Sequence, residues 1–495
     1  MEQRSKIPVD LPREDPTKSY WQDPPSDIAD CRTTPDLPIH ADVVIIGSGI
    51  SGASISYNLL SSEPNLKVVM LEARQAASGA SGRNGGHTKP ATYRSFSDNV
   101  HSVGAEDAMK ITRLEQTTME AVHAFAHKHQ IDCDSHRCQT VDVFYDLEQL
   151  QAARESVALM ETLMDPQNCP KHIFHDGKQT AERFLAQDSL GAVEYESGSL
   201  NAYKFTIGIL KLALQKGLNL QCNTPAIRIS KSDTDTNPTA SASSSVQWTI
   251  STASRGTITT PKLVLATNAY SAHLYPPLQG VVVPLRGVVT AQRPGLSISP
   301  RSCGRGRLDT TYSFVHEGDF EYMITRPSRD QTDINSNFDI VIGGGMHVAP
   351  GAGVSEYGNT DDTTYDKASA EYLLQCTKNK YFNNIWGPDH PDGQCRSVWS
   401  GIMAFSADGY PFVGPVPGEQ GLFLHVSFQG HGMVLCYSCA KAAASMILDS
   451  GKNGEQDEAA DGSKHSMSSL DSWFPNCYRV TSERLSRKFT DDYMP

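Results

Sequence analysis

Hydrophobic and polar positions along residues 42–72 fall into blocks that predict a strand, a turn, a helix and a second strand. The run VVII at 43–46 is apolar at every position, which is typical of a parallel strand buried on both faces. A glycine turn, GSGISG at 47–52, follows it, and we expect a helix over 50–60 and another buried strand over 67–71. This succession is typical of the βαβ unit that binds a dinucleotide.

Each glycine of the turn has its own mechanical role in this prediction. Gly47 permits the tight turn, Gly49 lets the backbone approach a pyrophosphate, and Gly52 lets the helix pack closely on the strand. The first N–H groups of the helix, at Ile50 and Ser51, point toward the phosphates together with the positive end of the helix dipole.

Glu72 follows the second strand and supplies the next predicted ligand. A carboxylate at this separation from the glycine turn accepts hydrogen bonds from both hydroxyls of an adenosine ribose, so the site does not favour a 2′-phosphate. A glycine turn alone is weak support, because such turns are common. The strand, the helix and the acidic residue around it favour a dinucleotide.

Residues 73–93, ARQAASGASGRNGGHTKPATY, indicate which dinucleotide is bound. This segment resembles the D-amino-acid oxidase superfamily, and GASGRNGGH at 79–87 is most similar to the γ-glutamylputrescine oxidase group of FAD-dependent amine oxidases. A mobile Gly/Ser linker, the alternative, would not normally carry RNGGH directly after a ribose-binding strand. The resemblance implies bound FAD, with Ala73 and Arg74 by the ribose and with Ser81, Arg83, Asn84, Gly85 and Gly86 around the pyrophosphate and the ribityl chain.

The chemistry of these residue types agrees with that implication. Arg83 can neutralise a diphosphate through two parallel hydrogen bonds. Gly85 and Gly86 remove the side chains that would keep the backbone away from a flavin.

Residues 399–448 carry a second resemblance to the same family. We expect a strand over 422–428, a tight turn over 429–432 and an Ala-rich helix over 433–448. A helix N-terminus beside the flavin N1 and C2 carbonyl would stabilise the negative charge that forms there on reduction. The backbone donors implied are those of Gly430, His431, Gly432 and Met433.

Three further positions follow from the family resemblance. It places Ala226 on a strand whose backbone contacts adenine, and Thr267 in a turn beneath the pyrophosphate. Asp408 either binds the ribityl chain or braces the turn, and both alternatives stay open.

Two departures from family patterns bear on the cofactor. Some relatives attach the flavin through a cysteine, but Gly401 stands at that position here, so we expect noncovalent FAD. Others activate oxygen with a lysine on a substrate-domain strand, where this chain has Val341. The sequence therefore leaves open whether O2 or another electron acceptor reoxidises the flavin.

We expect a two-domain α/β fold (α+β overall) of the glutathione-reductase-like, D-amino-acid oxidase type. A Rossmann-type FAD-binding domain interlocks with a substrate domain whose sheet is mainly antiparallel. Two domains are expected because a chain of 495 residues is too long to fold around a single hydrophobic core. Strands over 313–315, 320–325 and 338–343 predict that sheet. The predicted parts are an arm at 1–40, an FAD-binding domain at 41–105, 191–280 and 396–448, a substrate domain at 106–190 and 281–395, and a flexible tail at 449–495.

Helical spacing of apolar residues predicts helices over 106–129 and 147–164, and Asp366 is expected to cap another over 366–378. The arm contains Ser19-Tyr20-Trp21, which is similar to the arm of the γ-glutamylputrescine oxidase group and implies docking of its aromatic residues on the body. A disordered leader is the alternative. The aromatic residues expected to anchor the chain end are Trp473, Phe474 and Tyr478.

His87 is the best catalytic candidate, because it ends the loop that must lie beside the flavin ring. Simple support of that loop is the alternative role. Arg326 or Arg286 would clamp a substrate carboxylate, and Tyr322 or Tyr312 would add a hydroxyl, although each is more often an ordinary sheet or surface residue.

The net charge of −13 argues against a nucleic-acid partner, and no apolar run approaches the length of a membrane span. The first 15 residues lack the apolar core of a signal peptide, so the cytosol is expected. The 11 cysteines are scattered, which fits free thiols in a reducing compartment. We interpret CDSHRC at 133–138 as a turn rather than a metal site, and Cys436 and Cys439 as packing residues rather than a redox pair.

Three functions fit the sequence. The leading one is an FAD-dependent oxidoreductase that oxidises the C–N bond of a small amine or amino acid by hydride transfer to flavin N5, giving an imine that hydrolyses. A flavin monooxygenase acting on a secondary metabolite would need a Gly-Asp-Ala-type motif, where this chain has SADGYPFVG at 406–414. A non-enzymatic flavoprotein is the third, because a fold does not fix a function.

Overall fold

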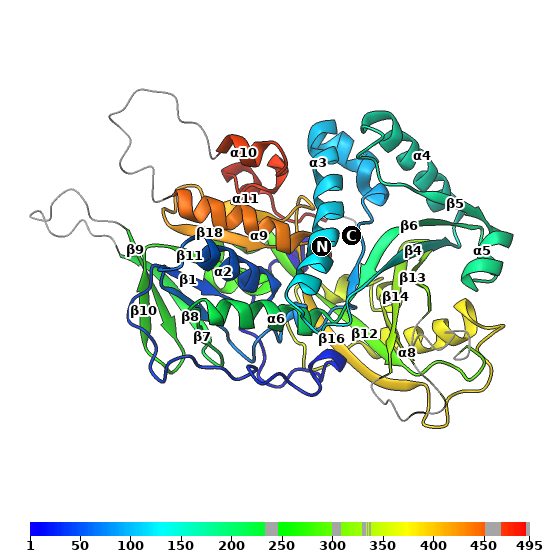
Figure 1. Cartoon of the computed structure of the whole chain (residues 1–495), viewed down its shortest axis with the longest axis horizontal. Helices are drawn as coiled ribbons and strands as arrows, with labels where there is room; N and C mark the ends of the chain where they lie inside the picture. Colours follow the sequence, from blue (N-terminus) through cyan, green and yellow to red (C-terminus); the bar gives the residue numbers. More distant parts are fainter. Residues whose placement is uncertain are drawn as a thin grey trace, which may run out of the picture.

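The computed structural model of the chain describes residues 1–232, 246–298, 308–328, 333, 335, 338–450 and 467–491. In this part of the chain two large sheets stand next to each other, and helices cover them (Figure 1). The parts of the predicted flexible tail at 451–466 and 492–495 lie outside the described residues.

The first sheet has six strands and contains the predicted βαβ unit. Strand β1 pairs in parallel with β2 and with β11, and the edge strand β17 runs antiparallel to β18. The buried strands predicted at 43–46 and 67–71 are confirmed. In spatial order the strands are β17 (Phe412–Pro415), β18 (Leu422–Val426), β11 (Leu263–Leu265), β1 (Val43–Ile46), β2 (Val68–Leu71) and β7 (Asn219–Gln221).

Both faces of this sheet are covered, which explains why β1 is apolar at every position. Val43 and Ile45 pack in a core with the helices α2, α6 and α9, whereas Val44 and Ile46 pack in a second core with a three-stranded sheet. The helices are α2 (Ile50–Ser62), α6 (Ala202–Gln215) and α9 (Gly432–Asp449), and the strands are β8 (Ala226–Ser232), β9 (Gln247–Thr252) and β10 (Thr257–Thr260).

The second sheet has nine strands and is mainly antiparallel, as predicted, although β4 and β13 run parallel. Strand β5 (Ile173–Asp176) pairs with β6 beside the main path. In spatial order that path is β16 (Cys395–Ser406), β12 (Val282–Gln292), β15 (Phe338–Gly343), β14 (Asp319–Pro327), β13 (Thr310–His316), β4 (His136–Phe144), β6 (Gly191–Ser199) and β3 (His87–Thr88).

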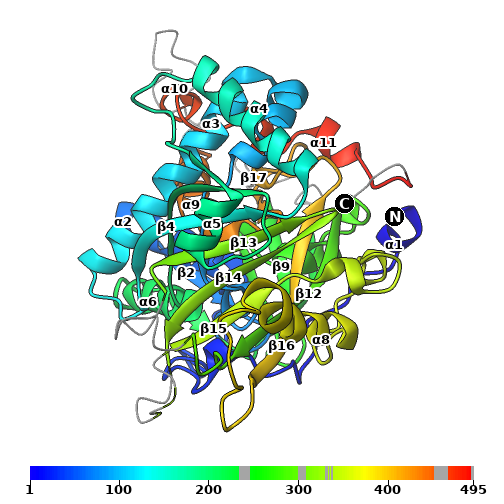
Figure 2. The ribbon, with the colours of Figure 1, turned by 90° about the vertical axis from the view of Figure 1, so that its right-hand side faces the viewer.

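Alternation along β14 separates two environments. Ile324 belongs to the core that faces the first sheet and includes Trp21 and Val341. Met323 belongs to a core on the opposite face, which is covered by α8 (Lys367–Cys376) (Figure 2). Since successive side chains of a strand point to opposite faces, Tyr322 faces the first sheet and Glu321 faces α8.

The predicted helices are present, with one boundary corrected. Helix α3 runs over Tyr93–Lys128 and starts earlier than predicted, because two helices join at Gly104, where φ is 84°. Helix α4 covers Leu147–Leu163, and Asp366 caps α8 by accepting a hydrogen bond from Ser369 N. The shorter helices are α1 (Glu2–Ser5), α5 (Gly177–Phe184), α7 (Ser271–Leu274), α10 (Met467–Asp471) and α11 (Ser482–Ser486).

The pairing of strand β6 differs from the domain boundary that we predicted at residue 191. We assigned the segment from 191 onward to the FAD-binding domain, but β6 pairs along its whole length with β4 of the large sheet. The chain returns to the first sheet only afterwards, through α6 and β7.

The N-terminal arm is docked on the body, as its family resemblance implied. Tyr20 and Trp21 are each only 3% exposed. Tyr20 donates to Asp339 Oδ2 at 2.6 Å, Ser19 Oγ donates to Gly82 O at 2.7 Å, and the Trp21 indole donates to Asn84 O. The alternative of a disordered leader is wrong for these residues.

The C-terminal segment is anchored as predicted. Phe474 and Tyr478 are buried, and the backbone N–H groups of Asn476 and Cys477 donate to Asp107 on α3. Within the described residues, α9 alone has the length and apolarity of a membrane span, but two thirds of it is buried inside the protein. Core helices of soluble proteins share these features.

Replacing Trp21 with alanine should lower the free energy of unfolding by about 3–5 kcal/mol, because it removes a buried aromatic ring that contacts the loop at 72–86, here called the flavin-domain loop. Urea denaturation of the purified protein measures this. Ile39→Ala, at a residue in the same arm that is 83% exposed, should change the value by less than about 0.5 kcal/mol. Equal effects of the two substitutions would contradict the docking of the arm.

Candidate functional site

The glycine turn between β1 and α2 leaves no room for side chains. Gly47 has a φ of +107°, and a Cβ there would collide with the backbone of Ala266. A Cβ on Gly52 would collide with Gly47 O, and one on Gly49 would lie 3.1 Å from Ser81 Oγ. The turn is therefore a backbone cradle at the start of α2, which fits a pyrophosphate.

Glu72 lies at the end of β2, directly behind this turn. Its Oε2 accepts hydrogen bonds from Ser48 N at 3.0 Å and Ser48 Oγ at 2.7 Å, and its Oε1 accepts one from Arg74 N at 2.9 Å. A carboxylate has about four acceptor positions, so capacity for ribose hydroxyls remains. The residue also stabilises the turn, which sequence reasoning did not foresee.

The loop after Glu72 is fastened to the turn. Ser81 Oγ accepts the Ile50 N–H at 2.8 Å, which ties the loop to the first turn of α2. Asn84 Oδ1 accepts the Gly86 N–H at 2.7 Å, and its Nδ2 donates to Ala80 O. Of the predicted pyrophosphate and ribityl residues, Ser81 is thus hydrogen-bonded directly to the glycine turn, whereas Asn84 stabilises the loop itself.

Arg74 and Arg83 both face Asp362, a buried residue of the substrate domain. Arg74 Nη1 lies 2.9 Å from Asp362 Oδ2, and Arg83 Nε lies 3.6 Å from the same oxygen. Arg83 also donates to Thr17 O at 2.7 Å and to Ser400 O at 3.1 Å. These guanidinium donors lie on protein groups, so their contact with a ribose or diphosphate stays a prediction.

Helix α9 begins at the second predicted cofactor contact. Gly430 has a φ of 73°, and the tight turn delivers the chain to Gly432 and Met433 in the first helical turn, whose N–H groups have no partner within a helix. His431 Nδ1 lies 2.9 Å from Gln429 O.

The remaining predicted cofactor residues occupy separate places. Asp408 is paired with Arg484, whose Nε lies 2.6 Å from Oδ2, which supports the bracing role of the two alternatives. Ala226 begins β8 and is buried. Thr267 follows β11, and its hydroxyl lies 2.8 Å from Ser271 Oγ.

His87 begins β3, where the flavin-domain loop enters the large sheet. Its Nε2 lies 2.6 Å from Thr311 Oγ1, and that hydroxyl donates to Thr140 Oγ1 at 2.9 Å. Thr311 must therefore accept from His87, which puts the imidazole proton on Nε2 and leaves Nδ1 as an acceptor. Burial places the pKa of His87 well below its ordinary 6.5, and the nearby Lys89 adds to this, so the ring is neutral.

Of the other catalytic candidates, Tyr322 alone contacts the flavin-domain loop. Its ring lies against Gly85, and burial raises its pKa to about 12. Arg326 is ion-paired with Asp134, and its guanidinium lies 4.5 Å from the Trp21 ring centre. These contacts hold Arg326 in the protein interior and speak against the predicted clamp.

The two weaker candidates are engaged elsewhere. Arg286 Nε lies 2.6 Å from Glu356 Oε2. Tyr312 lies on the α8 face of the sheet, where its hydroxyl donates to Phe184 O at 3.1 Å. Both side chains therefore have partners within the protein, and a role for either in substrate binding stays a prediction.

A buried charged cluster next to His87 was missed. Lys89 is ion-paired with Asp142 and donates to Ser313 Oγ at 2.7 Å, and Arg94 lies 2.8 Å from Asp142. Burial lowers the pKa of Lys89 to about 8, while Asp142 opposes that shift. The sequence signal was present, since Lys89 follows His87 by two positions, but its partner is 53 residues away.

The predicted turn at 133–138 is wrong in its second half, because His136, Arg137 and Cys138 begin strand β4 and pair with β6. Within the described residues, Cys133, His136 and Cys138 are not part of a group of potential metal ligands. Cys436 and Cys439 are both buried free thiols on α9.

A Rossmann-type sheet with this cradle, joined to a large antiparallel sheet at His87, defines an FAD-dependent oxidoreductase. A family model described as FAD dependent oxidoreductase (DAO) matches residues 42–446. The chain belongs to this family, so FAD is its cofactor.

Relatives in sequence are oxidoreductases. The chain is 26% identical to the probable oxidoreductase OrdL of Rhizobium meliloti over 435 residues, covering 86% of this chain and 88% of that protein. It is 33% identical to the γ-glutamylputrescine oxidoreductase of Escherichia coli over 96 residues, 19% of this chain and 22% of that protein.

Solved structures share the fold. Glycine oxidase from Geobacillus kaustophilus superposes with a TM-score of 0.62 and 17% identity, covering 83% of this chain and 95% of that one. L-amino acid deaminase from Proteus myxofaciens superposes with a TM-score of 0.61 and 16% identity, covering 89% of this chain and 96% of that one. At sequence identities this low, the structural similarity shows a shared fold alone.

Gly52→Ala should abolish FAD binding, because its Cβ would collide with Gly47 O and push α2 away from the cradle. FAD content after purification, read from the absorbance spectrum, measures this. Gly79→Ala is the matched control: a Cβ there meets nothing within 4 Å, and φ is −78°. Normal FAD content in Gly52→Ala would contradict the assignment of the cradle.

Proposed function

We propose that the chain oxidises the C–N bond of a small amine or amino acid. Bound FAD supplies a hydride acceptor at N5, and the imine product hydrolyses to a carbonyl compound. We further propose that O2 takes up the electrons from the reduced cofactor. The family membership supports FAD chemistry, and the amine substrate rests on the relatives named above.

The proposal rests on the position at which the flavin-domain loop joins the large sheet. The loop runs from Glu72 to Gly86 and enters the large sheet directly at His87, beside Tyr322 and Thr311. A substrate bound between loop and sheet would face the neutral His87 ring, whose Nδ1 can accept an N–H of the reacting amine. Positioning of this kind supplies much of the rate in reactions that need little acid–base chemistry.

The arginines favour a substrate without a carboxylate. Arg326 and Arg286 are each engaged by a carboxylate of the protein, Asp134 and Glu356. Recruiting Arg286 to a substrate would leave the buried Glu356 unpaired, which costs about 3–5 kcal/mol. Recruiting Arg326 would compete with its ion pair to Asp134, whose side chain is 28% exposed. We therefore place simple amines ahead of α-amino acids.

The purified protein should be yellow, release FAD on denaturation, and be bleached anaerobically by a member of a panel of amines. Paired compounds with and without an α-carboxylate test the preference, and oxygen consumption then separates an oxidase from a dehydrogenase. If every panel member leaves the flavin oxidised, the proposed activity is wrong while FAD binding still stands.

His87→Gln keeps a donor near Nε2 but removes the Nδ1 acceptor, so it should slow flavin reduction about tenfold, the value of one hydrogen bond. Because burial holds the pKa of His87 well below 6.5, the wild-type rate should show no step from His87 between pH 6 and 8. Stopped-flow absorbance measures both. His101→Gln, at an exposed site on α3, is the control. Unchanged reduction in His87→Gln would leave this residue with only the loop-supporting role.

A further inference from the structure

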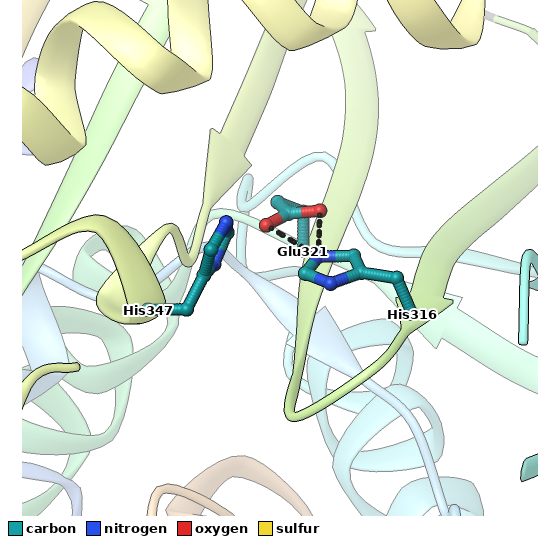
Figure 3. A group of neighbouring side chains, drawn as sticks. All are labelled: His316, Glu321 and His347. Carbon is teal, nitrogen blue, oxygen red and sulfur yellow. Dashed lines mark hydrogen bonds and ion pairs between the residues drawn. The ribbon is translucent and has the colours of Figure 1, made fainter.

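His316, Glu321 and His347 converge on the face of the large sheet that lies opposite Tyr322. One potential ligand atom from each lies within 4.8 Å of the others (Figure 3). His316 ends β13, Glu321 lies near the start of β14, and His347 lies in the short 3-10 helix Met346–Val348 that follows β15. Three separate segments thus bring two imidazoles and one carboxylate together.

The surrounding hydrogen bonds orient these groups for a common centre. His347 Nδ1 lies 3.0 Å from Asp319 Oδ2, and His316 Nδ1 lies 3.4 Å from Glu317 O, so each ring has an acceptor at Nδ1. Nε2 of His316 instead faces Glu321, at 3.1 Å from both carboxylate oxygens. Ligating histidines in metalloproteins are held in this way, with the second ring nitrogen donating to a carboxylate or a carbonyl.

Glu321 is also held in place by its neighbours, as the two histidines are. Its side chain is completely buried, the Tyr381 hydroxyl donates to Oε2, and His316 Nε2 lies 3.1 Å from both oxygens, so a metal ion would take the place of the His316–Glu321 hydrogen bond. A buried carboxylate facing two imidazoles is a strong attraction for a cation. Two histidines and one glutamate are also a known ligand set for Zn²⁺ with one coordination position left open.

We propose that His316, Glu321 and His347 bind a divalent transition-metal ion such as Zn²⁺. Ligands about 2.1 Å from a tetrahedral ion lie about 3.4 Å apart, so the cluster must contract slightly on binding. His347 is the member that can move, because its side chain is 30% exposed, whereas those of His316 and Glu321 are 12% and 0% exposed.

The position places the ion away from the flavin-domain loop. Glu321 and Tyr322 are neighbours on β14 with opposite orientations, so the ion would lie across the sheet from the flavin-domain loop. It would join the β13–β14 hairpin to the segment after β15, and so fix the strand that carries Tyr322. The inference is independent of the substrate proposed above.

Calorimetric titration of the chelator-treated holoenzyme with Zn²⁺ tests the site. We expect one Zn²⁺ per chain, about 10–100-fold weaker binding in Asp319→Asn, and a still larger loss in His347→Gln. Zn²⁺ should also raise the Tm of the wild type and leave that of His347→Gln unchanged. The flavin spectrum of each variant shows whether it remains folded.

His175→Gln is the matched control, because His175 Nε2 lies 3.0 Å from Glu194 Oε2 on the same sheet, and the other oxygen of Glu194 is paired with Arg183 rather than with a second histidine. It should bind Zn²⁺ as the wild type does. Absence of stoichiometric binding to the wild type, or equal affinity in His347→Gln, would overturn the proposal.

Discussion

The buried carboxylate of Asp362 is the contact on which the cofactor loop depends. Arg74 and Arg83 come from the two ends of that loop, and both guanidinium groups face this one oxygen pair. Thr17 of the arm donates its N–H to Asp362 O and accepts from Arg83, so three distant segments meet. Burial lowers the pKa of Arg83 to about 10, which still leaves it charged at pH 7. Without Asp362, two buried cations would repel each other with nothing to offset them.

Side chains along the strands of the large sheet point alternately to its two faces, and the two faces carry different kinds of residues. On the face toward the first sheet lie Tyr322, Thr311 and the Lys89–Asp142 pair, all close to the loop that carries the cofactor residues. On the other face, α8 covers an aromatic core, and the His316–Glu321–His347 cluster lies there. A one-residue shift of β14 would exchange these environments, so the pairing of β14 with β13 and β15 determines which residues reach the flavin side.

Local patterns could predict most elements, because strands, caps and turns are decided by neighbouring residues. The βαβ unit and the Asp366 cap are examples, whereas the docking of Tyr20 and Trp21 was expected only from the family resemblance. Partners far apart in sequence could not be predicted: Asp134 for Arg326 and Asp362 for Arg74 lie 192 and 288 residues away. The sheet to which β6 belongs could not be predicted for the same reason, because its pairing with β4 is a tertiary contact.

The two glycines before His87 show how such distant contacts change a local explanation. The sequence attributed them to close approach of a flavin. In the structure a Cβ on Gly85 would run into the Tyr322 ring, and one on Gly86 would run into Leu200 O. Gly86 also has a φ of +76°, a conformation that favours glycine. The substrate-domain sheet therefore requires both glycines by itself. A side chain at Gly85 would therefore displace the Tyr322 ring, so the conformation of this loop and the position of Tyr322 depend on each other.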